Sequence, residues 1–541
     1  MLLLLFVGCA VWAWAQRLRT YLWFFQQEEY DNRRFPAWWW SAHAWDRWLS
    51  LGLVVALGAE AVQPDAGLLA GAIWAVWRGR QEPNPLITGK KPLVPTQRAQ
   101  KLWWLAALLG LSGWLVLATL PGWAALLVAV VLLQITPLWL LLANLLLWPL
   151  QQWQNQRFLR EAQTILTRLA PKVVSISGSF GKTGTKYVLA HLLQAHAPTL
   201  MSPGSVNTPL GLARVLREQL QPQHAFFVAE MGAYNVGSIA GICRLVPPDA
   251  AAVISLGAAH FERFKTMEQV AIAELDELAQ ATIARRGPVV LNVDSMPTAL
   301  WQPRVAANPA AYVLVSAHLA HLRGPQDAHL TEVHETPEGL RLGFVWGGQT
   351  VLAQTQLYGT AQAGNVVSAF VLARLLGVPH ATAVAALRTA PAAPHRLNKR
   401  QEGPLTVLDD SYNANPAGFA AGLATLSLLA KEQGDENGIS PARRRILVTP
   451  GLVELGTLHD AEHARLGALA AEHADVALVV NPTRIPTFVA AFRAAMAPAQ
   501  ALHLLPSLNA AKTWLQANAQ PGDVVLLAND LPDLYEARWQ L

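Results

Sequence analysis

The first 150 residues constrain the fold more than any other feature, because they are apolar over stretches too long for most soluble folds. The two longest apolar runs match the roughly 20 residues that a helix needs to cross a bilayer. Inside a bilayer only helices and closed barrels satisfy their backbone hydrogen bonds. We therefore expect a multi-span α-helical membrane region over residues 1–153. The expected spans are residues 1–15, 48–62, 66–77, 102–120 and 123–150, the last interrupted by Pro137.

Composition agrees with this expectation. Hydrophobic residues make up 52% of the chain and charged residues only 14%, well below the usual share of about a quarter. Of the 21 tryptophans, 17 lie at or before Trp153, and tryptophan favours the membrane–water interface. Two alternatives stay open. The first run resembles a signal peptide, although Arg17 and Arg19 follow it, and the shorter runs resemble buried helices of a soluble domain.

Basic residues predict the orientation of these spans. The links between the second and third runs and between the fourth and fifth contain no Lys or Arg. Basic loops stay in the cytoplasm, so the other two links and everything after Trp153 are expected there. The prediction is a multi-pass protein of the inner (cytoplasmic) membrane. Its basic residues are Arg17, Arg19, Arg33, Arg34 and Arg47 after the first run, and Arg78, Arg80, Lys90, Lys91, Arg98 and Lys101 after the third.

From Lys172 onward, short apolar runs alternate with helical patterns, which predicts parallel α/β sheets. We expect a central P-loop ATPase-type domain over 154–393 and a C-terminal Rossmann-like α/β domain over 394–541. The proline-rich stretch 390–394 is the expected hinge. The expected strands are 173–176, 226–229, 251–255 and 289–292 in the central domain, and 406–408, 446–449, 476–480 and 524–527 in the C-terminal one; helices are expected at 417–433 and 461–473.

A glycine-rich turn follows the first of these strands and precedes a helical pattern at 187–194. Such a turn directs backbone N–H groups and the positive helix end at an anion. A lysine and a threonine hydroxyl in the turn suit phosphate and Mg²⁺. The full G-x-x-x-x-G-K-[ST] pattern is not met, because Ile176 stands where its first glycine belongs, so an ordinary glycine turn is the alternative. The candidate phosphate-binding residues are Gly178, Ser179, Gly181, Lys182 and Thr183.

Other polar residues follow predicted strands, at the edge where open α/β sheets bind ligands. Glu230 ends an apolar run and suits Mg²⁺ on nucleotide phosphates, or else serves as a helix cap or surface charge. A lone histidine such as His260 is more often structural, and turn propensity alone explains Asn207. The loop 409–416 holds more polar groups than a helix cap requires.

Together and in this order, these clusters resemble the Mur ligase family, whose ATP-dependent members join an amino acid or peptide to a carboxylate in peptidoglycan synthesis. The resemblance covers about residues 171–541. It is best to the members that add D-alanyl-D-alanine to a UDP-linked muramoyl tripeptide. It rests on 178–183, 207–211, 230–233, 259–260, 291–294, Asn365, 395–397, 410–416 and 454–456.

The resemblance implies an acid–amino-acid ligase that forms a carbon–nitrogen bond through an acyl phosphate. ATP and Mg²⁺ are the implied cofactors, and a muropeptide or other carboxylate and an amino acid or dipeptide amine are the implied substrates. It also implies that ATP bridges the central and C-terminal domains, which close before chemistry. The implied roles are Lys182 on the β/γ-phosphates, Thr183 and Glu230 on a first Mg²⁺, His260 on a second, Asn365 at the adenine, Arg396 at the γ-phosphate and Asp410 at the ribose, with Tyr412 and Asn413 as further nucleotide contacts and Lys182, His260 and Arg396 as catalytic residues.

The chain departs from the family in its metal site. The family usually carries a carbamylated lysine, which ligates the second Mg²⁺, about fifteen residues after the histidine. Here the stretch 270–278 contains no lysine. Because a carboxylate is also a hard oxygen ligand, we expect Glu274, or else Asp276 or Glu277, to supply the missing anion. A solvated helix face is the alternative.

The chain also departs from the family at its amino terminus, where the expected spans replace the domain that grips the UDP-sugar. This departure favours an alternative function: a membrane-associated ligase that acts on a lipid-linked muropeptide or a poly-amino-acid polymer. A transporter or signalling ATPase has less support, because the expected spans lack interior charges. A catalytically inactive scaffold is disfavoured, because Lys182, Glu230, His260, Arg396 and Asp410 are all retained.

Composition argues against a nucleic-acid partner and against a cysteine-based framework. The net charge of +5 is modest and no basic stripe is interleaved with aromatics, which argues against nucleic acid. The two cysteines, Cys9 and Cys243, are too few and too far apart for a disulfide framework or a metal cluster. The sequence does not identify a partner subunit.

Overall fold

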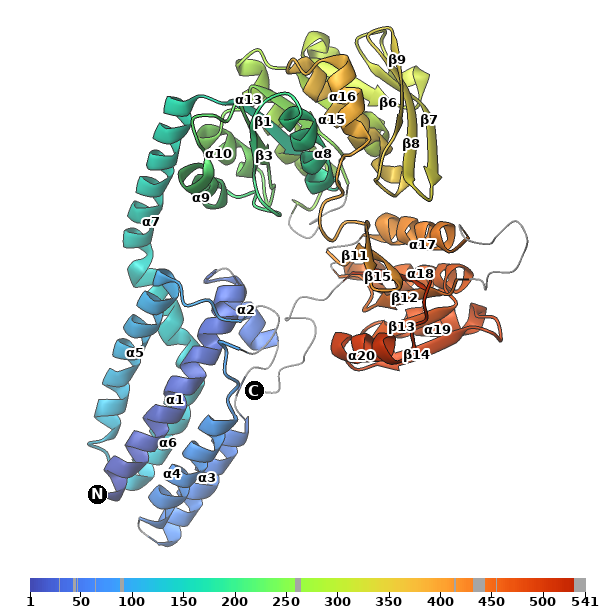
Figure 1. Ribbon diagram of the computed structural model, residues 1–541. Helices are drawn as coiled ribbons and strands as arrows, with labels where there is room; N and C mark the ends of the chain where they lie inside the picture. The colour runs from blue at the N-terminus through green and yellow to red at the C-terminus, as the bar shows by residue number, and fades with distance from the viewer. Residues whose placement is uncertain are drawn as a thin grey trace. The chain divides into compact units, whose positions relative to one another are not determined.

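The computed structural model describes residues 1–28, 30–41, 45, 47–63, 65–87, 92–257, 264–412, 415–431, 443–453 and 455–529. It forms two compact units, one of residues 1–155 and one of residues 156–530, and each is described by itself (Figure 1). The first unit is helical, and the second contains two β-sheets with helices packed on them.

The helical unit is built from helices that pack through small residues. A Cβ atom at Gly52 would lie 1.9 Å from the Trp74 indole nitrogen, and one at Gly110 would lie 2.3 Å from the Trp14 ring. These close approaches require glycine, and small residues at helix contacts are typical of membrane proteins. The helices are α1 (Leu2–Gln27), α2 (Arg34–Ser41), α3 (Arg47–Val62), α4 (Ala66–Gln81), α5 (Gln97–Leu117), α6 (Gly122–Gln134) and α7 (Thr136–Leu169), whose residues from 156 onward belong to the second unit.

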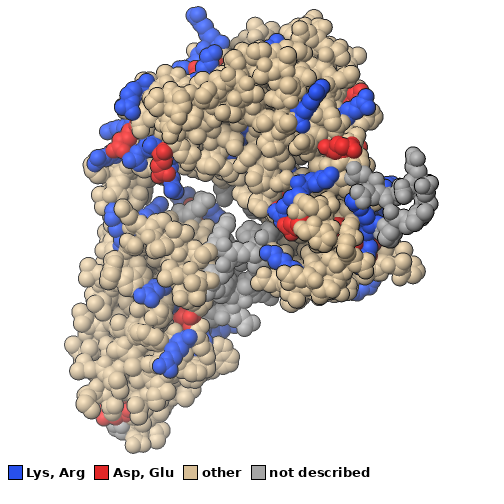
Figure 2. Space-filling view, in the orientation of Figure 1, with Lys and Arg blue, Asp and Glu red and all other residues tan. Residues whose placement is uncertain are grey.

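Among the described residues, α1 and α5 are each long and apolar enough to cross a membrane, and the bent pair α6–α7 makes a third candidate span. The bend of 56° lies next to Pro137, where the sequence predicted an interruption. Helices α3 and α4 have 16 residues each and are too short to count among these candidate spans. Figure 2 shows few charged side chains over much of the helical unit's visible surface.

The first span is longer than the expected 1–15. Helix α1 continues to Gln27, past the arginines that were expected to end it. Arg17 is 1% exposed and pairs with Glu82 at 2.8 Å. The paired charge therefore lies inside the helical unit, whereas the sequence predicted spans without interior charges.

The central sheet has nine strands in the order β2-β3-β1-β4-β5-β6-β7-β8-β9. The predicted strands near 173, 226, 251 and 289 are confirmed as β1, β3, β4 and β5. The sheet is mixed rather than wholly parallel, because β8 and β9 run antiparallel in a meander after β7. The strands are β1 (Lys172–Ser177), β2 (Thr199–Met201), β3 (Phe226–Glu230), β4 (Ala250–Val253), β5 (Val289–Asn292), β6 (Tyr312–Ser316), β7 (Ala328–Thr336), β8 (Gly339–Trp346) and β9 (Gln349–Gln354).

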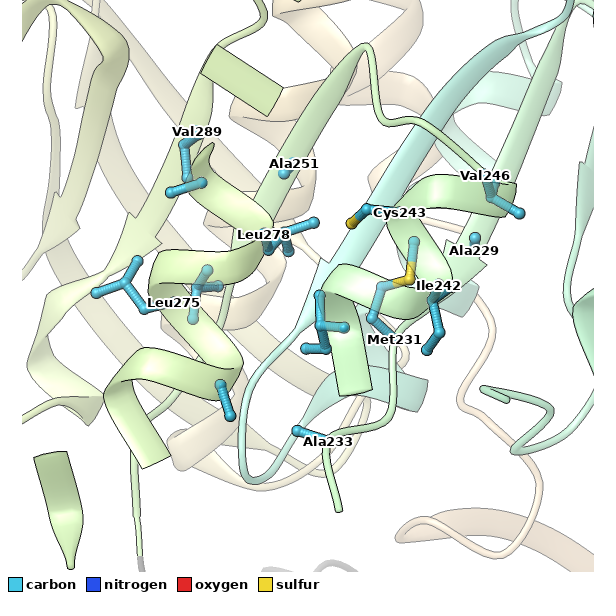
Figure 3. Packing of buried hydrophobic residues seen from close by; sticks show 14 of the residues in the cluster. Ala229, Met231, Ala233, Ile242, Cys243, Val246, Ala251, Leu275, Leu278 and Val289 are labelled. Atoms are coloured by element: carbon cyan, nitrogen blue, oxygen red, sulfur yellow. The ribbon is translucent and has the colours of Figure 1, made fainter. Parts of the chain in front are cut away.

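Helices cover both faces of this sheet. Successive strand residues point to opposite faces, so Val173 packs in one core and Val174 in the other. Figure 3 shows the first core, where Met231, Ile242 and Cys243 pack near the strand residue Ala229. The helices are α8 (Lys182–Gln194), α9 (Pro209–Gln219), α10 (Ser238–Leu245), α12 (Met267–Ala271), the π-helical turn η1 (Ile272–Asp276), α13 (Glu277–Ala284), α14 (Thr298–Ala307), α15 (Ala363–Leu375) and α16 (His380–Leu387).

The second sheet has six strands in the order β10-β11-β15-β12-β13-β14. All neighbours are parallel except the edge pair β10–β11. The predicted strands near 406, 446, 476 and 524 are confirmed as β11, β12, β13 and β15. The elements are β10 (Asn398–Glu402), β11 (Leu405–Asp410), α17 (Pro416–Lys431), β12 (Arg445–Thr449), α18 (His459–His473), β13 (Val476–Val480), α19 (Pro486–Ala495), β14 (Ala501–Leu505), α20 (Leu508–Asn518) and β15 (Val524–Ala528).

Candidate active site

The glycine-rich turn joins β1 to α8, and two of its glycines are sterically required. Gly178 has φ 135° and Gly181 has φ 81°, both in the region that favours glycine. A Cβ atom at Gly178 would lie 2.8 Å from the Ser255 nitrogen, and one at Gly181 would lie 2.4 Å from the Asn365 amide nitrogen. The turn is therefore a narrow cradle that a side chain at either position would fill.

The first part of the turn is held by the loop that follows β4. The Ser179 N–H donates to the Ser255 carbonyl (3.0 Å), and the Phe180 N–H donates to the Ser255 hydroxyl (2.7 Å). The Ser179 hydroxyl donates to the Gly257 carbonyl (3.0 Å) and accepts from its N–H (2.9 Å). These amides face the protein, so an anion would meet the N–H groups that begin α8, which have no acceptor within the helix.

The Lys182 side chain lies over this turn. Its ammonium donates to the Gly178 carbonyl and lies 3.5 Å from the Ser179 carbonyl. A positive charge at the start of α8 adds to the partial positive charge of the helix end. The cradle thus combines backbone donors with a cation, which is the arrangement that a polyphosphate requires.

Glu230 is the centre of a buried polar cluster at the carboxyl ends of β1 and β3. One carboxylate oxygen accepts from the Thr183 hydroxyl (2.9 Å) and pairs with the Lys186 ammonium (3.0 Å). The other accepts from the Asn207 amide (3.2 Å). Parallel pairing of β1 with β3 sets Ile176 opposite Glu230, which explains why the carboxylate lies beside the turn. The structure thus brings together three residues that the sequence singled out.

Lys186 is a member of this cluster that the sequence analysis missed. Its side chain is 0% exposed, and its ammonium donates both to Glu230 and to the Gly204 carbonyl. Burial lowers the pKa of Lys186, while the Glu230 carboxylate opposes that shift. Its spacing from Lys182 and Thr183, four and three residues on, puts all three on one helix face. That spacing is the signal that could have identified it.

Asn365, at the start of α15, lies against the turn at Gly181. Its side-chain oxygen accepts from the Asn292 amide (3.0 Å), which also donates to the Ser295 hydroxyl (3.2 Å). Asn292 ends β5 and is 2% exposed. Asn292 therefore fixes the orientation of Asn365, a role that the sequence pattern did not reveal.

Arg396, Asp410 and Tyr412 gather near the start of the second sheet. The Arg396 guanidinium lies 4.8 Å from the centre of the Tyr412 ring. Burial lowers the pKa of Arg396, while Asp410, Tyr412 and Glu230 oppose the shift. Burial raises the pKa of the Asp410 carboxyl to about 7, against the opposing effects of the Leu397 N–H, which donates to it (3.0 Å), and of Arg396.

Asp409, next to these residues, supports the same loop. It is 2% exposed and accepts from the Ser411 hydroxyl (2.6 Å), the Arg400 guanidinium (2.8 Å) and the His395 ring (2.8 Å). Burial raises the pKa of Asp409, but the bonds from Ser411 and His395 outweigh it and leave the pKa below its usual value. An ionised Asp409 thus ties 395–400 to the loop after β11.

The three acidic candidates around the missing lysine have different surroundings. Asp276 pairs with Arg304 (2.6 Å), and Glu277 accepts from the N–H groups of Gly237 and Ala240 at the start of α10. Glu274 is 2% exposed and lies in the π-helical turn η1. Single π-helical turns within α-helices are frequent at functional sites. Its burial and its place in this turn keep Glu274 the preferred candidate.

The described residues contain no group of three or more His, Cys, Asp or Glu side chains arranged to hold a metal ion. His260 and Asn413, predicted as a metal ligand and a nucleotide contact, lie outside the described residues. The Thr183–Glu230 pair offers two oxygen ligands of the kind that Mg²⁺ prefers. The metal assignments of His260 and Glu274 stay predictions.

Two stretches of the chain match domains of one known family. Residues 176–373 match the Mur ligase middle domain, and residues 395–529 match the domain described as "Mur ligase, glutamate ligase domain". The UDP-N-acetylmuramoyl-tripeptide–D-alanyl-D-alanine ligase of Mycobacterium leprae is 32% identical over 379 residues, which cover 66% of this chain and 70% of the relative. The chain belongs to the Mur ligase family.

This Mur ligase is therefore an ATP-dependent enzyme of the class that forms amide bonds in peptidoglycan synthesis. Relatives with the same name are 31% identical in Mycobacterium tuberculosis, where the match covers 55% of this chain and 56% of the relative, and 29% identical in Escherichia coli, where it covers 57% and 64%. The match thus leaves a substantial part of each relative uncovered.

Solved structures share the fold of this Mur ligase. A crystal structure of MurF from Acinetobacter baumannii gives a TM-score of 0.60 at 23% identity, covering 71% of this chain and 78% of that one. The Thermotoga maritima MurF ligase in complex with ADP gives 0.56 at 21% identity, covering 71% and 82%. At these identities the likeness establishes the fold alone.

Proposed function

We propose that this chain joins D-alanyl-D-alanine to the tripeptide carboxylate of UDP-N-acetylmuramoyl-tripeptide, with ATP and Mg²⁺ as cofactors. The relatives reported above carry that activity in their names. The observation that carries the proposal is the buried cluster in which Thr183 and Lys186 meet Glu230 beside the glycine cradle. It unites a polyphosphate cradle with a carboxylate suited to a divalent cation.

The residues fit a bound ATP. The narrow cradle formed by Gly178 and Gly181 suits the β- and γ-phosphates, with Lys182 and the first N–H groups of α8 as donors. Asn365, beside Gly181, would meet the adenine. From the second sheet, Arg396 would contact the γ-phosphate. Asp410 would contact the ribose, with Tyr412 and Asn413 as further nucleotide contacts.

When bound, ATP would supply the phosphoryl group that activates the acceptor carboxylate as an acyl phosphate with release of ADP, and the attacking amine would then displace phosphate. Lys182 and Arg396 neutralise charge that develops on the transferred oxygens. Thr183 and Glu230 would hold the first Mg²⁺, and His260 and Glu274 the second. Asn292 orients Asn365, and Lys186 holds the carboxylate of Glu230 in place. The chain's contribution is therefore positioning and charge neutralisation.

The proposed domains are a helical membrane region over 1–153, a central P-loop-type ATP-binding domain over 154–393 and a Rossmann-like C-terminal domain over 394–541. Candidate spans α1, α5 and α6–α7 support insertion into the cytoplasmic membrane. The positive-inside distribution supports a cytoplasmic location for the catalytic domains. Substrates linked to a lipid or a polymer have no support among the relatives' names.

A phosphate-release assay tests the proposal. Purified full-length protein is given Mg²⁺, ATP and either UDP-N-acetylmuramoyl-tripeptide or a lipid-linked muropeptide, each with D-alanyl-D-alanine, D-alanine or glutamate. We expect sustained release only with the soluble tripeptide and D-alanyl-D-alanine, and none from a Lys182→Met variant. Release that depends on the lipid-linked acceptor, or on a different amine, would contradict the proposed substrates.

A further inference from the structure

Two adjoining hollows lie between α5 and α7 in the helical unit. The larger is a groove of about 580 Å³, and the smaller has a volume of about 10 Å³. Lys101, Leu147 and Leu150 line both, so the two hollows are continuous. None of the steps assigned to the ligase reaction uses these residues.

The hollows are polar at one end and apolar at the other. Gln151 and Gln154 of α7 line the smaller hollow together with Lys101 of α5. Trp104 and Leu108, up to two turns or about 10 Å further along α5, line the larger groove. Because α5 is a candidate membrane span, this polarity matches the change from head-group region to hydrocarbon along a membrane helix.

The charge at the polar end is positive. Of the residues that the structure places around either hollow, none is acidic. Arg98 is held there, because its guanidinium donates to the Asn144 side chain (3.3 Å) and lies 4.2 Å from the centre of the Tyr30 ring. Lys101 is exposed, as is Gln97 one turn earlier. This end therefore suits an anion that carries several hydrogen-bond acceptors.

The walls of the larger groove suit a hydrocarbon chain. Trp104 is 68% exposed and Leu108 is 67% exposed, and both present mostly apolar surface. Exposed apolar groups next to a basic end fit an amphiphile rather than a free phosphate. The positive-inside distribution puts the start of α5 at the cytoplasmic leaflet.

We propose that this groove binds a lipid with an anionic phosphate head group, with the phosphate at Lys101 and an acyl chain along Trp104 and Leu108. The inference rests on the proposed membrane insertion of the helical unit and is independent of the ligase chemistry. Bound lipid would fill the gap between α5 and α7 and fix both helices at the cytoplasmic leaflet. The ligand class follows from the cation and the apolar walls together.

Lipid retention tests this inference. The full chain is placed in nanodiscs of phosphatidylcholine that contain a minority of phosphatidylglycerol, and native mass spectrometry then counts the lipids retained after release from the disc. We expect phosphatidylglycerol to be enriched on the wild-type protein. Lys101→Gln should reduce that retention about fivefold, since one lysine near an anionic head group contributes about 1 kcal/mol, and Lys101→Arg should preserve it.

Arg80→Gln is the matched control, because Arg80 is an exposed cation in the last turn of α4 and lines neither hollow. It should leave retention unchanged. Retention of the two lipids by the wild type in proportion to their shares of the disc, or equal losses in Lys101→Gln and Arg80→Gln, would overturn the inference. Phosphate release by the same samples reports the ligase reaction separately, so failure of one proposal is not mistaken for failure of the other.

Discussion

At the scale of single residues, the candidate site depends on a carboxylate shared by several donors. Glu230 accepts from Thr183, Lys186 and Asn207 while 2% exposed. The sequence predicted Glu230 and Thr183, because strand ends and glycine turns leave a local pattern. It did not reveal Lys186, since a lysine within a helix is ordinarily a surface residue. Its spacing from Lys182 and Thr183 was the available signal, and the packing of α8 against β3 shows that its ammonium lies beside Glu230.

Replacing Lys186 with methionine should weaken both folding and turnover. Removing one partner of a buried ion pair leaves the other charge poorly compensated and costs about 3 kcal/mol. Glu230 keeps its bonds from Thr183 and Asn207, so the variant should still fold. We expect a lower melting temperature and at least a tenfold loss in kcat, which is about 1.4 kcal/mol in the barrier.

Lys172→Met is the control for this variant, because Lys172 is exposed at the start of β1. Thermal unfolding and steady-state kinetics measure both proteins. A Lys186→Met variant as stable and active as Lys172→Met would show that the buried pair has no role in the site.

Asp410 should make stability depend on pH. Its pKa is raised to about 7 in the folded chain from an ordinary 3.8. A raised carboxyl pKa means that the folded state favours protonated Asp410. The contribution of Asp410 to the stability of the fold is therefore full below pH 3.8 and is lost as pH rises through about 7. Melting temperature should fall by a few degrees more between pH 5 and 8 in the wild type than in Asp410→Asn. Parallel pH profiles for the two proteins would contradict the assignment.

Glu274 is the residue that we expect to replace the family's modified lysine. Glu274→Gln removes the charge and keeps the shape, so ligation should fall at least a hundredfold, equivalent to about 2.7 kcal/mol, while ATP binding changes little. Glu268→Gln on the neighbouring turn, where Glu268 is 57% exposed, is the control. Turnover and nucleotide affinity are measured for both. Near-normal turnover by Glu274→Gln would exclude the role.

Among the secondary-structure elements, the hydrophobic pattern correctly predicted the strands that are buried on both faces of the central sheet. It did not predict the antiparallel meander or the π-helical turn. The apolar runs that became β1, β3, β4 and β5 are nearly continuous, as parallel strands require. The meander β7–β9 carries polar residues such as His334 and Arg341 on one side, which obscured it. The π-helical turn η1 has no sequence signature, because its backbone geometry follows from packing.

The helices of the first unit depend on glycine contacts that a larger residue would break. Gly110→Leu would force the Trp14 ring away from α5, because even a Cβ atom would lie 2.3 Å from that ring. Overpacking of this kind costs about 1–3 kcal/mol. The melting temperature in detergent should fall measurably. Gly58→Leu, at a position with open space around it, should leave it unchanged, and an equal fall in both variants would contradict this account of the packing.

At the scale of the whole molecule, the sequence predicted a helical unit followed by two α/β sheets, and the structure contains these parts. The order of these parts could be predicted because the apolar composition changes near Trp153 and turn residues recur after Lys172. The length of α1 could not be predicted, because Arg17 is paired inside the helical unit with Glu82, 65 residues later. Pairings between residues so far apart in the sequence are invisible to local patterns.

The product of the reaction is the most direct test of the proposed ligase activity. Full-length protein is incubated with Mg²⁺, ATP, UDP-N-acetylmuramoyl-tripeptide and D-alanyl-D-alanine, and the mixture is resolved by mass spectrometry. We expect the wild type to form one UDP-N-acetylmuramoyl-pentapeptide for each ADP, and Lys182→Met to form neither product. ADP formed without pentapeptide, or unchanged tripeptide with intact ATP from a folded wild-type protein, would contradict it.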